Sequence, residues 1–401
     1  MASGIDLDSV NRFRLHRQHL AEDSHIEDIA QITRDIYGLH ATNATTPYLS
    51  LFARAKDFSR DKLDKELYVK KTLGKIRCIR KTVHILPRET IPVAFAATKS
   101  IVEPNSADFL RITGGVTQEE YETASQEILK ILKGEGMSTA LIKKRLGSSL
   151  NISLIVNLMC DQGLLMRGCS EKGWKSNTHT YYAFSDYFPG MDLNSVDPAE
   201  AREITVRQYL AAYGPATVKD ISWWSGFTMT EIRRILHVMA RETVEVEIQG
   251  LAGSYVILAE DRADLQRLRC SGQPAVNLLP ALDPYLMGYK ERGRYLDREH
   301  QEMVFDRSGN ATSVILVNGR AAGIWDVREG MAPTVKVFFF RQPEKKVRAL
   351  AEVRALDMGR FLTGREVALE TCDSMVPLTQ RNAGGFMSPL APSAGKGVSI
   401  P

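Results

Sequence analysis

Apolar residues recur at helical spacing in a pattern that occurs twice in the middle of the chain. In the clearer copy, Thr117 and Glu120 have the spacing of a capping box, and the apolar residues after them repeat at helical intervals as far as Leu132. Two shorter helices and two strands are then predicted, at residues 139–146, 152–161, 164–167 and 180–184. Three helices followed by a strand pair are the outline of a winged helix.

A second copy of this outline follows in nearly the same register. Gly136 and Gly214 are 78 residues apart, and Gly147 and Gly226, at the next turn of each copy, are 79 residues apart. The helices and strands of this copy are predicted at residues 204–213, 218–224, 228–240, 244–248 and 255–259. Its third helix is expected to start from a Thr228–Glu231 capping box. Repetition at a fixed spacing indicates tandem modules rather than one large sheet.

The N-terminal part fits a first copy, whereas the last third of the chain does not repeat the pattern. Ser24 to Glu27 is expected to cap a helix that runs to Tyr37, and Lys75 to Leu86 is expected to form the strand pair. In the last third, Asn318-Gly319 has the composition of a type I′ hairpin turn. Three strands and one long helix are predicted there, at residues 313–317, 321–327, 334–340 and 344–362.

We therefore expect a mainly α protein with small β-sheets (α+β), built from three tandem winged-helix modules and a C-terminal β-barrel-like domain. The modules are predicted at residues 5–110, 111–190 and 198–265, and the C-terminal β domain with its helix at residues 272–370. Residues 379–401 are rich in Gly, Pro, Ser and Ala, and we expect them to form a loosely ordered tail.

Composition narrows the class of protein. With 44% hydrophobic and 25% charged residues the chain is an ordinary globular protein, and its net charge of +4 does not by itself demand a nucleic-acid partner. Five cysteines without CxxC spacing fit reduced thiols and argue against a disulfide framework or a structural zinc site. No apolar stretch approaches the ~20 residues of a membrane span, and the acidic start of the chain lacks the apolar core of an export signal. We expect a soluble, cytoplasmic and nucleoid-associated protein.

Common enzyme fingerprints are missing, and the sharpest local signal is charge. The chain has no GxxxxGK[ST], no GxGxxG after a strand, no HExxH and no nucleophile elbow, so we expect neither a metal nor a nucleotide or other cofactor. Residues 70–81, in contrast, hold six basic residues and no acidic one. This run is either a solvated strand pair whose lysines protect a sheet edge or a wing that binds phosphates. A winged-helix setting favours the wing.

Four segments, in the same order, resemble the AlkZ/YcaQ-like winged-helix DNA glycosylases, which remove alkylated bases and unhook interstrand crosslinks. The four segments are Arg80 to His84, Tyr213 to Gly226, Asn277 to Arg292, and the Gly-x-x-x-Gly-x-Trp hairpin from Gly319 to Trp325. The resemblance covers roughly residues 10–365. It implies a monofunctional enzyme of DNA repair or genotoxin self-resistance, which hydrolyses the N-glycosidic bond of alkylated purines in double-stranded DNA. Three modules in one chain make a monomer sufficient.

The resemblance also locates a candidate catalytic pair. Members of this family carry Gln-x-Gln or Gln-x-Asp just after a helix of the first module, and the matching positions here are His40 and Thr42. Residues two apart in an extended segment point the same way, so both side chains could meet one water. A cationic alkylated base is a good leaving group, so the site needs only to place a water and tolerate positive charge on the sugar. Neutral His40 could accept the proton of the water and Thr42 could orient it, which predicts faster release as His40 deprotonates near pH ~6.5.

Further DNA contacts are expected from the basic run and from the start of the C-terminal domain. The predicted DNA-binding residues are Lys70, Lys71, Lys75, Arg77, Arg80, Lys81, Thr82, His84, Tyr289, Lys290 and Arg292. For the cluster around Asp283 and Tyr289, a domain junction and a backbone contact remain equal alternatives. Trp223 and Trp224 are interpreted as core and interface of the third module. The rival to an enzyme is a regulator or lesion-binding protein that kept the scaffold and lost the water-activating pair.

Overall fold

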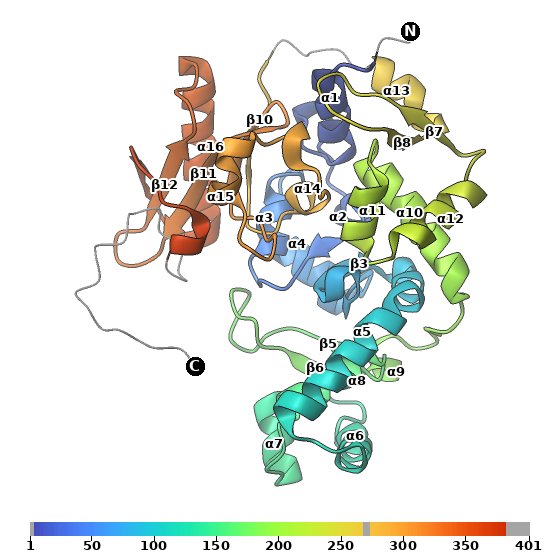
Figure 1. Cartoon of the computed structure of the whole chain (residues 1–401). Helices are drawn as coiled ribbons and strands as arrows, with labels where there is room; N and C mark the ends of the chain where they lie inside the picture. Colours follow the sequence, from blue (N-terminus) through green and yellow to red (C-terminus); the bar gives the residue numbers. More distant parts are fainter. Residues whose placement is uncertain (1–3, 268–272, 382–401) are drawn as a thin grey trace.

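The computed structural model describes residues 4–267 and 273–381, so most of the predicted tail at 379–401 lies outside the described residues. Figure 1 shows the arrangement of the parts, with β11, β12 and α16 at the left of the view, α10 to α12 at the right and α6 to α8 at the lower end. In the described part of the chain, no helix is both long enough and apolar enough to cross a membrane.

The N-terminal segment forms short helices around a three-stranded antiparallel sheet in which β3 is central. Its elements are α1 (Leu7–Arg17), α2 (Ile29–Asp35), β1 (Leu39–His40), α3 (Thr46–Phe52), α4 (Arg60–Asp64), β2 (Leu73–Arg77), the turn η3 (Ile79–Lys81) and β3 (Val83–Pro87). The expected cap of α2 at Ser24 is wrong. Asp28 caps this helix by accepting a hydrogen bond from the Gln31 N–H, because its carboxylate precedes the first helical turn directly.

Helix α5 (Ile91–Gly114) connects the N-terminal segment to the next unit and was not predicted as one helix. Pro104 lies inside it, and an internal proline usually argues for a helix boundary. Packing against α8 (Ile152–Asp161) and α10 (Pro198–Tyr213) supports α5 on two sides. The contacts with two other helices explain why local sequence signals did not reveal its length.

Residues 116–183 form a helical unit with its own apolar core around Ile128, Ile142 and Ile155. The predicted capping box is confirmed, since Thr117 accepts from the Glu120 N–H while the Glu120 carboxylate accepts from the Thr117 N–H. The elements are α6 (Gln118–Ile131), β4 (Met137–Ser138), α7 (Thr139–Leu146), α8, β5 (Leu165–Arg167) and β6 (Thr180–Ala183), followed by α9 (Phe184–Tyr187). The strands are ordered β4-β6-β5.

The next unit has the predicted helices and strand pair, with one difference at a cap. Its elements are α10, α11 (Val218–Ser225), α12 (Met229–Val238), β7 (Thr243–Val246), β8 (Tyr255–Leu258) and α13 (Arg262–Arg267). Thr228 accepts from the Glu231 N–H as expected. The reciprocal half of the capping box is missing, because the Glu231 carboxylate pairs with Arg202 on α10 at 2.6 Å.

The C-terminal segment contains an open sheet rather than the expected barrel. Within the described residues the strand order is β13-β12-β11-β10-β9, and the edge strands β13 and β9 are not paired with each other. The strands and helices are β9 (Val276–Leu279), α14 (Pro284–Met287), α15 (Gln301–Val304), β10 (Val314–Val317), β11 (Arg320–Arg328), β12 (Thr334–Phe339), α16 (Lys345–Thr363) and β13 (Ala368–Thr371). Asn318 and Gly319 have φ values of 50° and 80°, as a type I′ turn requires.

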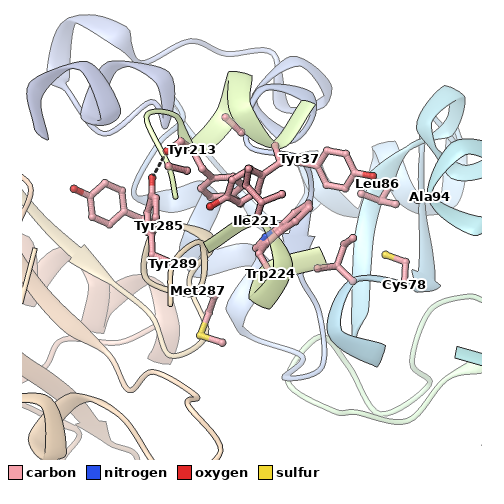
Figure 2. Packing of buried hydrophobic residues seen from close by; sticks show 14 of the residues in the cluster. Tyr37, Cys78, Leu86, Ala94, Tyr213, Ile221, Trp224, Tyr285, Met287 and Tyr289 are labelled. Atoms are coloured by element: carbon pink, nitrogen blue, oxygen red, sulfur yellow. Dashed lines mark hydrogen bonds between the residues drawn. The ribbon is translucent and has the colours of Figure 1, made fainter. Parts of the chain in front are cut away.

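A shared core holds the N-terminal, third and C-terminal segments together. Tyr37, Tyr213, Trp224 and Tyr289 belong to one buried cluster although they come from different segments, as Figure 2 shows. Tyr209 and Tyr213 stack with ring centroids 5.0 Å apart within it. Aromatic side chains bury large apolar areas, so this cluster fixes how the segments meet.

Two fully buried ion pairs cross the same junction. The two terminal guanidinium nitrogens of Arg54 contact Asp283, at 2.8 and 2.7 Å, and Arg294 contacts Asp220 at 3.0 Å. Asp283 is 0% exposed. Asp283 therefore belongs to the domain junction, while the backbone-contact alternative stays open for Lys290 and Arg292 of the same cluster.

Candidate active site

The register of the first sheet brings two histidines together. His40 ends β1 and lies directly opposite His84 on β3. Opposed residues of an antiparallel pair share one face of the sheet, and these rings are 5.2 Å apart between centroids. The Ala41 N–H donates to the Val83 carbonyl at 2.7 Å, so the chain stays extended one residue past His40.

Burial keeps both imidazoles neutral. His40 is 6% exposed and His84 is 8% exposed. Burial lowers the pKa of His40 to about 2, with smaller contributions from His84 and Arg80, and burial lowers the pKa of His84 to about 4. The expected deprotonation of His40 near pH ~6.5 is therefore wrong, since an exposed histidine has that pKa and this one is enclosed. In the described part of the chain, the buried Nδ1 of His40 has no hydrogen-bond partner.

Thr42 lies just beyond the strand, in an exposed bend. The bend is held from within by Asn43, whose side-chain oxygen accepts from the Thr45 N–H at 3.1 Å. It is also held from outside, because the Ala44 N–H donates to the Asn177 side chain in the β5–β6 loop at 2.7 Å. A water bound between His40 and Thr42 would thus lie at the boundary of protein and solvent.

The turn between β2 and β3 places Arg80 against Trp223 on α11. The guanidinium carbon of Arg80 is 3.9 Å from the centroid of the Trp223 ring, a cation–π contact. Arg292 approaches the same indole at 5.9 Å and lies 3.4 Å from the ring centroid of Phe305. In residues 4–267 and 273–381 neither arginine forms an ion pair with a carboxylate, and Asp306 acts on both only through its charge. Burial, and then repulsion by Arg292, lower the pKa of Arg80 to about 10. Asp306 favours the charge of both arginines from beyond ion-pair distance, so two cations share one nearby carboxylate and could still bind an anion.

Two predicted DNA contacts of the basic run face away from His40. Lys75 and Arg77 flank the residue opposite His84 on β2, so their side chains point to the other face of the sheet. Arg77 donates to the buried Asp161 on α8 at 3.0 Å, and Lys75 donates to the Tyr68 hydroxyl at 2.6 Å. The prediction that both belong to an exposed phosphate-binding wing is wrong, because protein partners on the far face hold them.

The other lysines of the run remain at the surface. Lys70 is exposed and pairs with Glu66 one helical turn earlier at 2.6 Å. Lys71 lies with its Nζ 4.4 Å from the ring centroid of Tyr187. Lys81 is exposed at the tip of the turn, with a φ of 58°. Among these three, Lys81 lies next to Arg80 and is best placed to contact the same anion.

The remaining predicted DNA contacts also include both buried and exposed residues. Tyr289 is 0% exposed, donates to the Tyr213 carbonyl at 2.7 Å (the dashed line of Figure 2) and accepts from Arg14 Nε at 2.8 Å. Its assignment to DNA binding is wrong, because its hydroxyl is enclosed in the core. Lys290 is exposed, and Thr82 donates within its own turn at 2.9 Å.

One cluster of potential metal ligands lies outside this site. Asp297, Glu299 and His300 bring their ligand atoms within 4.8 Å of one another. Asp297 pairs with Arg320 at 2.5 Å, and Glu299 pairs with Arg341 at 2.9 Å. The carboxylates are thus neutralised by arginines. A cavity of about 680 Å³ is lined in part by Asp297 and His300, and none of the predicted site residues lines it.

Sequence reasoning missed two residues of the site. Trp223 packs against the core as expected, but it is only partly buried, unlike Trp224 at 4% exposed, and its contacts with Arg80 and Arg292 were not predicted. Adjacent residues of a helix point about 100° apart, so one of two neighbouring tryptophans had to face outward. Asn177 gave no signal, because its contact with Ala44 depends on how two distant loops meet.

Comparison with known proteins identifies the class to which this scaffold belongs. A family model described as "DNA glycosylase AlkZ-like" matches residues 33–361, and the chain therefore belongs to the AlkZ-like DNA glycosylase family. The matched range contains β1, the histidine pair and the Arg80–Trp223–Arg292 cluster.

Two more specific similarities come from Streptomyces sahachiroi. The chain is 24% identical over 331 residues to a protein named interstrand DNA cross-link repair glycosylase, covering 79% of this chain and 86% of that protein. The solved structure of the DNA glycosylase AlkZ from this organism superposes with a TM-score of 0.73 at 21% identity, covering 92% of this chain and 100% of the other. At this identity the superposition shows a common fold.

Proposed function

We propose that this protein is a monofunctional DNA glycosylase that hydrolyses the N-glycosidic bond of alkylated purines in duplex DNA. The observation that carries the proposal is the buried, neutral imidazole of His40 at the end of β1, with an unpartnered Nδ1, at the position where the family resemblance expects a polar catalytic residue. Family membership supports the reaction class. The units containing α6–α8 and α10–α12 are proposed to act as winged helices on the DNA.

In this proposal His40 orients the attacking water by accepting a hydrogen bond from it. The exposed Thr42 hydroxyl forms a second hydrogen bond with the same water and so fixes its orientation. A strongly lowered pKa makes His40 a weak base that does not keep the proton, so this proton passes to bulk solvent on the exposed Thr42 side as the water oxygen forms the bond to the sugar. An uncharged ring next to the sugar does not oppose the oxocarbenium character of the transition state. A cationic leaving base takes the bonding electrons and departs neutral, so no general acid is required.

Arg80 and Arg292 are proposed to bind a DNA phosphate near the lesion, with Lys81 and Lys290 as outer contacts. The support is their convergence on Trp223 without carboxylate partners in the described residues. Such contacts position the duplex and carry no sequence information. The name of the Streptomyces sahachiroi relative makes interstrand crosslinks a second substrate to test beside monoadducts.

The deciding experiment is incubation of the purified protein with duplex DNA that contains 7-methylguanine, followed by alkali to cleave abasic sites. Cationic 7-methylguanine and 3-methyladenine are expected to be released, whereas neutral 1,N6-ethenoadenine and undamaged purines are not, because the site offers no strong acid. Tight binding of alkylated DNA without base release at any pH would instead establish the rival, a non-catalytic lesion-binding protein.

A further inference from the structure

A second concave site lies on the opposite face of the β1–β3–β2 sheet from His40. Ala41 and Ile85, which alternate with the two histidines along their strands, form part of its wall. The cavity measures about 180 Å³. The β5–β6 loop closes it from the side of the neighbouring unit, contributing Cys169, Trp174 and His179.

The polar side chains that line this cavity include one positively charged and one negatively charged group. Lys75 Nζ donates to the Tyr68 hydroxyl at 2.6 Å and has no carboxylate within ion-pair distance in the described residues. The Asp64 carboxylate accepts from the Tyr48 hydroxyl at 2.6 Å. Nδ1 of His179 is buried without a hydrogen-bond partner among residues 4–267 and 273–381. The cavity therefore offers an ammonium donor, a carboxylate acceptor and an unpaired ring nitrogen.

The remaining wall is aromatic and aliphatic. Tyr48 and Trp174 meet edge to face with centroids 5.0 Å apart, and the ring of Tyr68 lies below Lys75. Pro47 and Leu67 complete the apolar lining. Flat apolar walls with a few convergent polar groups are typical of sites for small molecules.

We infer that this cavity binds a planar nitrogen heterocycle with hydrogen-bond donors and acceptors, a ligand of the nucleobase type. A bound anion would be repelled by Asp64, and a bound cation would be repelled by Lys75. A neutral heterocycle can form hydrogen bonds with both residues and stack on the aromatic walls. Its volume is far above the roughly 10–15 Å³ that a single water requires. The site does not depend on the proposed function, because binding there uses the face of the sheet away from His40.

The two faces are connected through one loop. Ala44 lines the cavity, and its N–H is held by Asn177 of the same loop that closes the cavity. The base could reach this site either as a free molecule or while still attached to DNA. The chemistry of recognition is the same for both sources, and the experiment must separate them.

The test uses the fluorescent base 2-aminopurine with the full-length protein. Free 2-aminopurine is expected to bind both the unchanged protein and His40→Ala, with quenching by Tyr68 and Trp174. His179→Phe should weaken binding at least tenfold, and Lys75→Met should do the same. His25→Phe is the matched control, since His25 also has a buried unpartnered ring nitrogen and lines a different cavity of about 260 Å³.

Each outcome decides the inference. Binding to His40→Ala together with loss in both His179→Phe and Lys75→Met, each shown to be folded by circular dichroism, supports the site even if no glycosylase activity exists. Displacement of free 2-aminopurine by duplex DNA, seen as recovery of its fluorescence, would assign the site to an extruded base. Absence of that signal, with free-base binding retained, would assign it to free base. No binding of either form at millimolar concentration, or equal binding by His25→Phe and His179→Phe, overturns the inference.

Discussion

His40 and His84 face each other across β1 and β3, with their rings inclined by 60° and their centroids 5.2 Å apart. Each is enclosed, and Arg80 adds positive charge near both. Protonation of either ring would place a cation in a buried site beside another cation. The pair is therefore held in the uncharged state, which determines how the site responds to acid.

Base release should be nearly independent of pH between about 5.5 and 8. The pKa of His40 is lowered to about 2, so this ring does not titrate in that window. The measurement is the single-turnover rate of 7-methylguanine release at several pH values. A rate that rises through a midpoint near ~6.5 would show that His40 is solvated in solution, contrary to the structure.

Stability, in contrast, should fall as the pH drops below about 6.5. The folded pKa of His40 lies below its unfolded value of ~6.5, so the unfolded chain binds the proton first. The stabilisation is complete above this value and declines toward pH 5, where it has lost about 2 kcal/mol for this residue. Urea unfolding of the unchanged protein and of His40→Gln at pH 7.5 and 5 measures the difference. An equal decline in both proteins would contradict the burial of this ring.

His40→Ala should reduce base release by on the order of 10² or more while DNA affinity changes little. His40→Gln restores the residue type of the resembled family and is expected to keep part of the activity. Single-turnover excision and filter binding on the same duplex separate the two effects. Normal excision by His40→Ala would remove this residue from the mechanism and leave family membership intact.

Arg80→Gln and Arg292→Gln should each weaken DNA binding irrespective of sequence. Every lost phosphate contact should reduce the slope of log K against log salt by roughly 0.9 on B-form DNA. Lys70→Gln serves as the control, because Lys70 is exposed, paired with Glu66 and separate from Trp223. Equal slopes for Arg80→Gln and the unchanged protein would place the DNA elsewhere.

Asp283→Asn should destabilise the fold by about 3–5 kcal/mol, since it leaves Arg54 buried without a counter-charge. Asp297→Asn breaks a partly exposed pair with Arg320 and should cost less than about 1 kcal/mol. Urea unfolding of the two variants compares them directly. Similar losses would mean that the junction around Asp283 is open to water.

The sequence predicted the helices of the repeated units well because their signals are local. Thr117 and Glu120 close a capping box within four residues, and Gly147 and Gly226 end helices with φ values of 60° and 81°. The cap at Ser24 failed because several acceptors compete in that segment and Asp28 lies closer to the first turn. Helix signals are reliable where they depend on neighbours along the chain.

Local sequence signals do not predict the environment of the candidate active site. Burial of His40 and Tyr289, and the pairing of Arg77 with Asp161, depend on segments that are distant in sequence. One local signal does indicate which face of the sheet two of the basic residues occupy. Lys75 and Arg77 alternate with Ile76 on β2, and Ile76 is the residue opposite His84. The side chains of Lys75 and Arg77 therefore point to the other face of the sheet.

The ion pair between Arg54 and Asp283 joins positions 229 residues apart. At synthesis rates of roughly 5–20 residues per second, the arginine leaves the ribosome between about 11 and 46 s before its partner. During this interval the N-terminal segment lacks the Asp283 carboxylate and the Tyr289 hydroxyl to which Arg14 donates in the finished protein. Its completion must therefore wait for translation of the C-terminal third, and a prematurely terminated chain would expose unfinished surfaces that chaperones and proteases recognise.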